Sequence, residues 1–245
     1  MSVSKIDQYF DLSPEQQKKL EEDVNSDLEN LRRERFVKLA AALRAIDREA
    51  QHASRNENVL GNAYTVLQRE YKMDSGQLSS SAKKLMVSLK REQILYFQTQ
   101  VDKEIASDRA ESVADKNREL VSRFRKVFKF FAGDLTPEQS NSITTFTQMK
   151  PFPWKQKIDN REQILVRFLK FQSQPEQRAK LVGQFMENYD SLCTPEYLRE
   201  MTNYENEFKD FLNKFWTTMS SEQKVQLHLH LEDQAQELER LARGL

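Results

Sequence analysis

Proline and glycine are scarce in this chain, and their positions limit its fold more strongly than any other feature of the sequence. There are 5 glycines and 6 prolines among 245 residues. Sheet proteins place these residues at most of their turns, whereas this chain is rich in Gln, Glu, Lys, Arg, Leu and Ala, which occur readily in helices. The sequence therefore predicts an all-α protein, an elongated bundle of about eight to ten helices whose first helix is long.

Four of the prolines precede a glutamate, at Pro14, Pro137, Pro175 and Pro195. Proline is tolerated at the first helical position, and a preceding Ser or Thr can accept the free N–H groups of the first turn. A Gln three residues after the cap can reach back to the cap residue, which is the pattern of a capping box. The sequence predicts this helix-cap motif at three places: Ser13 with Gln16, Thr136 with Gln139, and Ser220 with Gln223.

Apolar residues at three- and four-residue steps predict one helix of nearly forty residues that ends near His52. Prolines at 151 and 153 prevent the segment from Lys150 to Trp154 from being helical at its centre. We expect a long-helix half at 1–133 and a C-terminal helical half at 134–245, together one continuous helical unit. The further predicted helices are 56–73, 78–105 with a break at Leu89, 107–133, 137–149, 158–172, 175–192, 195–218 and 221–243.

The charge balance, the hydrophobic pattern and the cysteine content argue against several classes of protein. The chain has 38 basic and 38 acidic residues, and this balance disfavours a nucleic-acid partner, which usually needs a basic excess. No run of eighteen apolar residues predicts a membrane span, and no apolar stretch of signal-peptide length follows Met1. The single cysteine, Cys193, excludes an internal disulfide and any zinc site made of several cysteines.

Several segments together carry a resemblance to a known group of proteins. They are Tyr9-Phe10-Asp11-Leu12-Ser13-Pro14-Glu15-Gln16, Arg32-Arg33-Glu34, Leu135-Thr136-Pro137-Glu138-Gln139, the Pro/Trp segment, Thr194-Pro195-Glu196-Tyr197 and Ser220-Ser221-Glu222-Gln223. With these the chain resembles a family of uncharacterised bacterial envelope lipoproteins over nearly its whole length. The Leu-Ser/Thr-Pro-Glu-Gln element is also similar to a motif of the Spy and CpxP periplasmic proteins, and that similarity implies a chaperone-like role. The resemblance implies a periplasmic protein, anchored to a membrane only through a lipid that lies outside this chain.

Five aromatic residues form the candidate partner-binding surface. Tyr9 and Phe10 either pack back on the first long helix as a hydrophobic staple or stay exposed to grip a partner. In the run from Arg123 to Phe131, helical spacing puts Phe124, Val127, Phe128 and Phe131 on a core stripe, and Phe130 fits that stripe least well. The proline loop is either a lid over the bundle or a binding element. The candidates are Tyr9, Phe10, Phe130, Phe152 and Trp154.

Catalytic and metal-binding patterns find little support in the sequence. His228 and His230 are two residues apart, so they do not share a helix face and cannot both bind a metal from one helix. We expect Cys193 to be a buried apolar residue, and we expect no enzyme activity, no metal and no cofactor. The sequence favours a non-enzymatic protein that binds other proteins; the alternatives are a structural adaptor or spacer in an envelope complex and a cytosolic helical scaffold. It leaves the oligomeric state open.

Overall fold

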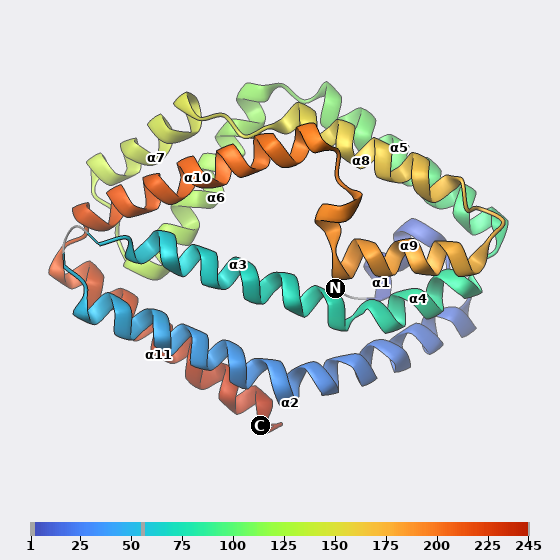
Figure 1. Cartoon of the computed structure of the whole chain (residues 1–245), viewed down its shortest axis with the longest axis horizontal. Coiled ribbons are helices and arrows are strands. Elements are labelled where there is room, and N and C mark those ends of the chain that lie inside the picture. Colours follow the sequence, from blue (N-terminus) through green and yellow to red (C-terminus); the bar gives the residue numbers. More distant parts are fainter. Residues whose placement is uncertain (1–2, 55–56, 245) are drawn as a thin grey trace. The chain divides into compact units, whose positions relative to one another are not determined.

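The computed structural model describes residues 3–54 and 57–244, and in these ranges every regular element is a helix. Figure 1 shows the chain from end to end. The described elements are α1 Val3–Phe10, α2 Pro14–His52, α3 Val59–Gln77, α4 Ser79–Ser88, α5 Arg91–Ala110, α6 Val113–Ala132, α7 Pro137–Met149, α8 Trp154–Leu169, α9 Pro175–Glu187, the 3-10 helix η1 Tyr189–Leu192, α10 Pro195–Thr218 and α11 Ser221–Ala242. None of the described helices is long and apolar enough to span a membrane.

The all-α class is confirmed, but two finer expectations about the helices are wrong. The first helix, α1, is short, with 8 residues, and the long helix of 39 residues is the second. The described ranges contain eleven α-helices and one 3-10 helix, not eight to ten helices. The chain turns sharply after α1 because Asp11 adopts a positive φ of 50° and Leu12 donates its N–H to Asp7 Oδ1 at 2.7 Å.

Most predicted helix boundaries agree with the structure within a few residues, and the break at Leu89 separates α4 from α5. The start predicted at residue 56 lies outside the described residues. The start predicted at Ser107 is wrong, because α5 continues to Ala110 and the next cap is Ser112, whose Oγ accepts the N–H of Asp115 at 3.1 Å. Pro153 ends the irregular stretch after α7, and α8 begins at the next residue.

The chain divides into two compact units, and each takes three separate segments of the sequence. Unit 1 contains Met1–Leu31, Tyr71–Glu111 and Trp154–Leu198; unit 2 contains Arg32–Glu70, Ser112–Pro153 and Arg199–Leu245. This grouping differs from the expected halves at 1–133 and 134–245. Each segment contributes one helical hairpin, so unit 1 has the hairpins α1–α2, α4–α5 and α8–α9, and unit 2 has α2–α3, α6–α7 and α10–α11.

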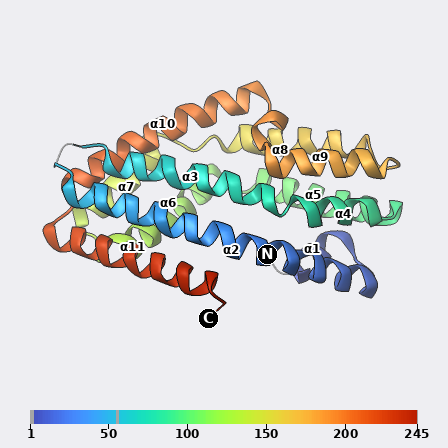
Figure 2. The ribbon, with the colours of Figure 1, turned by 60° about the horizontal axis from the view of Figure 1, so that its bottom comes forward.

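Aromatic rings fill the core of unit 2. Phe211, Phe215 and Trp216 of α10 are buried, and Phe128 of α6 packs on Phe215 with ring centroids 4.3 Å apart. The helical spacing of these residues predicts this core, and their α10 neighbours Tyr204 and Phe208 pack against it. Helix α11 covers one side, and it lies beside the C-terminal part of α2 in both views (Figures 1 and 2).

Unit 1 has a core of its own around Phe97 of α5. Phe10 stacks on Phe97 at 4.7 Å, and Phe168 meets the same ring edge-on at 5.2 Å. Helix α4 packs along α9, and α5 packs along α8. Arg178 is buried at the start of α9, where its guanidinium donates to the carbonyl oxygens of Met86 and Leu89, both at 3.0 Å. This bond pair ties the α8–α9 hairpin to the end of α4.

Candidate functional site

All three predicted helix caps have both bonds of a capping box. Thr136 Oγ1 accepts the N–H of Gln139 at 3.2 Å, and the Thr136 N–H donates to Gln139 Oε1 at 3.0 Å. Ser220 with Gln223 has the same pair of bonds, at 3.2 and 3.1 Å. In the Ser13 cap, Gln16 is the partner, with bonds of 3.3 and 3.0 Å. Each of these glutamines also binds a second glutamine.

In unit 2, Gln139 and Gln223 form a reciprocal pair of amide hydrogen bonds, which we call a glutamine clasp. Gln139 Nε2 donates to Gln223 Oε1 at 2.8 Å, and Gln223 Nε2 donates to Gln139 Oε1 at 2.9 Å. The second N–H of each amide reaches a main-chain carbonyl two residues before the other cap, Thr218 O at 3.1 Å and Asp134 O at 2.9 Å. The clasp therefore joins the tip of the α6–α7 hairpin to the tip of the α10–α11 hairpin.

Unit 1 repeats the clasp with Gln16 and Gln93. Their amides exchange bonds of 3.1 and 2.8 Å. Gln16 Nε2 also donates to Ser88 O at 3.0 Å and Gln93 Nε2 to Asp11 O at 2.9 Å, again two residues before the partner's cap. The recurrent Glu-Gln dipeptides signal these residues in the sequence, but the pairing joins positions 77 and 84 residues apart, and spacing along the chain does not reveal it.

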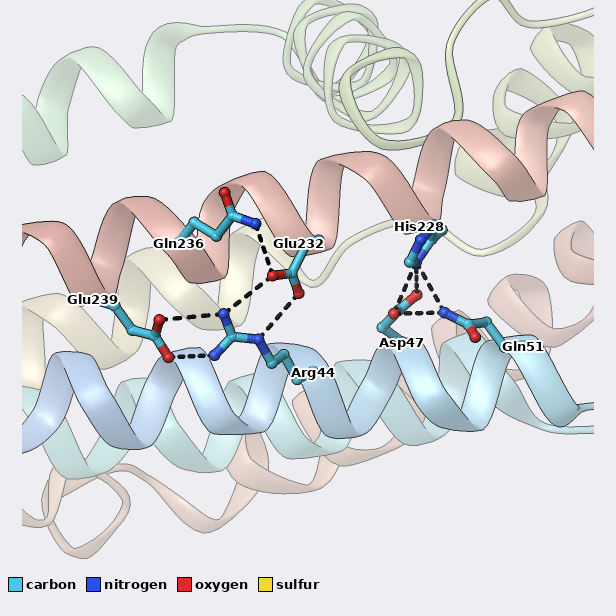
Figure 3. A network of polar contacts seen from close by, with 7 residues as sticks. All are labelled: Arg44, Asp47, Gln51, His228, Glu232, Gln236 and Glu239. Atoms are coloured by element: carbon cyan, nitrogen blue, oxygen red, sulfur yellow. Dashed lines mark hydrogen bonds and ion pairs between the residues drawn. The ribbon is translucent and has the colours of Figure 1, made fainter.

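A charged seam holds α11 against α2 in unit 2 (Figure 3). The Arg44 guanidinium donates to both carboxylate oxygens of Glu232, at 3.0 and 3.1 Å, and it also binds Glu239. These hydrogen bonds raise the pKa of Arg44 and lower the pKa values of Glu232 and Glu239. Gln236 Nε2 donates to Glu232 Oε1 at 2.9 Å. Glu232 and Glu239 therefore reach α2 directly, and Gln236 holds the Glu232 carboxylate from within α11.

Nearer the start of α11, His228 continues the seam. Its Nδ1 lies 2.9 Å from both carboxylate oxygens of Asp47 and 2.9 Å from Gln51 Nε2 (Figure 3). The Asp47 carboxylate is buried, and the imidazole is partly exposed. His228 therefore joins α11 to α2. His230 contacts Phe130 of α6 instead, with the ring centroids 5.0 Å apart and the rings tilted by 39°. The two histidines thus contact different helices, as their spacing of two residues predicts.

Four large apolar side chains stay exposed on the neighbouring helices α6 and α11. They are Val127, Phe130, Val225 and Leu229, between 47% and 55% exposed, and we call them the α6–α11 patch. Val225 and Leu229 lie one turn apart on the face of α11 opposite its buried residues. His230 connects the two helices, because it follows Leu229 on α11 and its ring contacts that of Phe130 on α6. The expectation that Val127 belongs to the core stripe is wrong; Phe124, Phe128 and Phe131 make that stripe.

Phe130 is the only one of the five predicted surface aromatics that is more than one-third exposed. Phe10 is 9% exposed and stacks on Phe97, so it is not part of an exposed surface. Tyr9 is partly buried, and its hydroxyl donates to Glu104. This hydrogen bond and burial raise the pKa of Tyr9. Both residues pack toward the unit 1 core, but their ring and hydroxyl contacts are with α5 and not with the long helix on which a staple would pack.

The proline loop also packs inward. Phe152 is partly buried and meets Tyr204 of α10 edge-on at 5.1 Å. Lys157 lies over the Trp154 ring, with 5.4 Å from Nζ to the ring centroid. Lys150 forms an ion pair with Glu207 at 2.7 Å. The contacts of Phe152 and Lys150 with α10 fit the lid alternative, whereas the Trp154 contact lies within α8 itself.

Cys193 is buried beside Asn160, whose Nδ2 lies 3.5 Å from Sγ, and burial raises the pKa of the thiol. A raised pKa lowers the fraction of thiolate, which is the reactive form. No group of three or more metal-binding side chains was found in the described part of the chain. A pocket of about 260 Å³ between α1 and α5 is lined by Tyr9 and Glu104, which already bond to each other.

A model for a protein family, described as "Family of unknown function (DUF6279)", matches residues 8–198, which is more than half of the chain. The matched range covers the unit 1 clasp and Thr136 with Gln139, and it ends before α11. Neither the curated proteins nor the solved structures contain a match to this chain.

Proposed function

Because the chain belongs to the DUF6279 family, whose function is unknown, we propose a function from the residues themselves: a non-enzymatic helical protein that binds other proteins. One observation carries the proposal, namely the exposed α6–α11 patch. Large apolar side chains that gather on a surface usually mark a contact with another molecule. We propose that the partners are proteins of the bacterial envelope, including unfolded chains, and that the role is chaperone-like.

The surroundings of the patch support weak and reversible binding. Basic residues of α6, among them Arg123 and Lys126, lie beside Val127 and Phe130, whereas acidic residues such as Glu222 and Asp233 lie beside the α11 pair. A rim of both signs lets chains of different sequence approach, while four apolar side chains give each contact only a modest free energy. A chaperone that works without ATP needs this combination of contact and release.

The location in the periplasm and the lipid anchor rest on the resemblance to envelope lipoproteins. We propose them together with the binding role, because a helical protein held at a membrane can meet chains that have just crossed it. Fractionation of source cells tests this part, and the protein should stay with the envelope and leave it only when detergent is added. Recovery in the cytosol would instead support the alternative of a cytosolic helical scaffold.

The binding role is tested by the aggregation of an unrelated denatured protein. The wild-type chain at substoichiometric to equimolar amounts should slow the rise in light scattering. The double variant Phe130→Ser with Leu229→Ser should weaken this protection while its far-UV circular dichroism stays unchanged. Tyr71→Ser is the matched control, because Tyr71 is exposed but lies in unit 1, outside the patch.

Two outcomes would contradict the chaperone-like role. A wild-type chain that fails to delay aggregation in several buffers would leave only the adaptor or spacer alternative. If the patch variant and the Tyr71 control lost equal protection against aggregation, any exposed apolar residue would contribute, and the patch would have no special role. A stable complex of fixed stoichiometry with one envelope protein would favour the adaptor.

A further inference from the structure

The two helices that carry the α6–α11 patch have opposite charges. Helix α6 contains six basic and two acidic residues, a net charge of +4. Helix α11 contains two basic and five acidic residues, a net charge of −3 with its histidines neutral. The chain as a whole is neutral. The exposed apolar residues therefore lie on one basic helix and one acidic helix.

Most of these charges already have partners within the chain. Arg123 pairs with Glu119, and Arg240 pairs with Glu237, both at 2.6 Å. Lys126 of α6 and Asp233 of α11 are exposed, and neither has an ion-pair partner among the residues that the structure describes. One positive and one negative charge at the patch can therefore form ion pairs with another molecule.

Lys126 and Asp233 lie at the same level along the helices. Phe130 contacts His230, and Gly133 lies next to Gln226, so α6 and α11 run antiparallel. One turn back from Phe130 is Lys126, and one turn on from Leu229 is Asp233. Each charged residue is thus one turn away from the apolar centre, in the same direction.

We propose that the α6–α11 patch binds the same patch of a second copy of this chain. A twofold axis parallel to the helices places α6 of each copy over α11 of the other. Phe130 then meets Leu229 at the centre, with Val127 on one side of this contact and Val225 on the other. Lys126 meets Asp233 twice, once on each side of the axis. A surface with one basic and one acidic helix is complementary to itself under this rotation, which is the requirement for a closed dimer.

This inference rests on the proposed function, because both use the same patch. The dimer covers the residues that would bind an unfolded chain, so dissociation controls how much binding surface is free. Four apolar side chains and two exposed ion pairs make a small interface, for which we expect a dissociation constant in about the micromolar range. Chaperone activity should then reside in the monomer.

Sedimentation equilibrium of the full chain with two charge reversals tests the proposal. The wild type should pass from monomer to dimer as its concentration rises. Lys126→Glu alone and Asp233→Lys alone should each raise the dissociation constant about tenfold, because the axis repeats every reversed contact. An equimolar mixture of the two variants should dimerise like the wild type, since both contacts then join opposite charges across the two chains.

The mixture distinguishes contact between chains from any effect within one chain, because only a contact between copies is restored by mixing. Lys18→Glu is the control: Lys18 is exposed on α2 in unit 1, and its reversal changes the net charge equally but should leave dimerisation unchanged. A wild type that stays monomeric, or a mixture without recovery, would overturn the inference. Protection against aggregation is measured separately on dilute monomer, so its loss would affect the proposed function and not this test.

Discussion

At the scale of single residues, glutamine at the third helical position does more than cap a helix. A capping box accepts either Glu or Gln, because only an acceptor oxygen is needed there. The clasp needs a donor as well, and Gln139 and Gln223 each supply a buried amide N–H to the other. A carboxylate has no such donor when it is ionised. The clasp therefore selects Gln at positions where capping alone would not.

We expect Gln139→Glu to destabilise the protein, because it buries a charge and turns one Gln-to-Gln bond into a contact between two acceptors. The loss should be about 2–3 kcal/mol in the free energy of unfolding, measured by urea denaturation. The control is Glu138→Gln, one residue earlier and exposed, which should change stability by less than about 0.5 kcal/mol. Equal stability of Gln139→Glu and wild type would show that the clasp contributes nothing.

The cap hydroxyls should contribute less to the free energy of unfolding than the clasp does. Thr136→Ala, Ser220→Ala and Ser13→Ala each remove one acceptor at a helix start, and each should lower the free energy of unfolding by about 1 kcal/mol. The exposed ends of the helices let water replace part of the lost bond. Urea midpoints that stay unchanged in all three variants would contradict the capping role of these residues.

At the scale of elements, Asp23 joins α2 to α4. Its carboxylate lies 2.7 Å from Lys84 and 3.2 Å from Lys19, and it is largely buried. The hydrogen bond from Lys84, followed by that from Lys19, holds the pKa of Asp23 below its usual value in spite of burial. The ion pair thus stabilises the folded state only while Asp23 is ionised.

The stability that Asp23 contributes should be lost in acid. A lowered folded-state pKa means that the contribution is complete above the unfolded-state value of about 4 and disappears as the pH falls through the folded-state pKa. Lys84→Met should therefore lower the urea midpoint at pH 7, and its difference from wild type should shrink below about pH 4. Lys18→Met, which removes an exposed lysine away from Asp23, should follow the wild type at every pH.

At the scale of the whole molecule, both units use one plan. In each unit, a glutamine clasp joins two hairpin tips, and a second contact attaches the third hairpin. In unit 1 this second contact is Arg178, which reaches the carbonyl oxygens at the end of α4. In unit 2 it is Trp216, whose Nε1–H donates to Ser54 O at 3.3 Å. Hairpins from distant parts of the sequence therefore depend on one another within each unit.

Hydrogen exchange should reveal this dependence. Gln93→Ala should speed amide exchange at the first turns of α2 and α5, because the lost clasp frees both tips of unit 1. Gln223→Ala should do the same for α7 and α11 in unit 2. The decisive amide is that of Ser13, which Gln16 binds directly: acceleration by Gln93→Ala shows that the caps are coupled, whereas an unchanged rate would make them independent.

The sequence by itself determined most of the secondary structure, apart from the short α1 and the start of α6. Scarce glycine and proline, helical spacing of apolar residues and Ser/Thr-Pro-Glu caps fix where helices begin and end, because these signals act over a few neighbouring residues. For that reason the α7 and α10 boundaries match at both ends. The same local signals gave the capping residues and the aromatic core of α10, but they treated Tyr9 and Phe10 as possible surface.

Only the tertiary structure decided which helices meet. The clasp partners are 77 and 84 residues apart, and Arg44 meets residues 188 and 195 positions away. Val127 is exposed, whereas aromatic residues of α6 fill the core. Hydrophobic spacing says which face of a helix is buried but not against which neighbour, because burial of apolar surface has no direction. Specific pairing arises from hydrogen bonds and charges that form once the hairpins lie together.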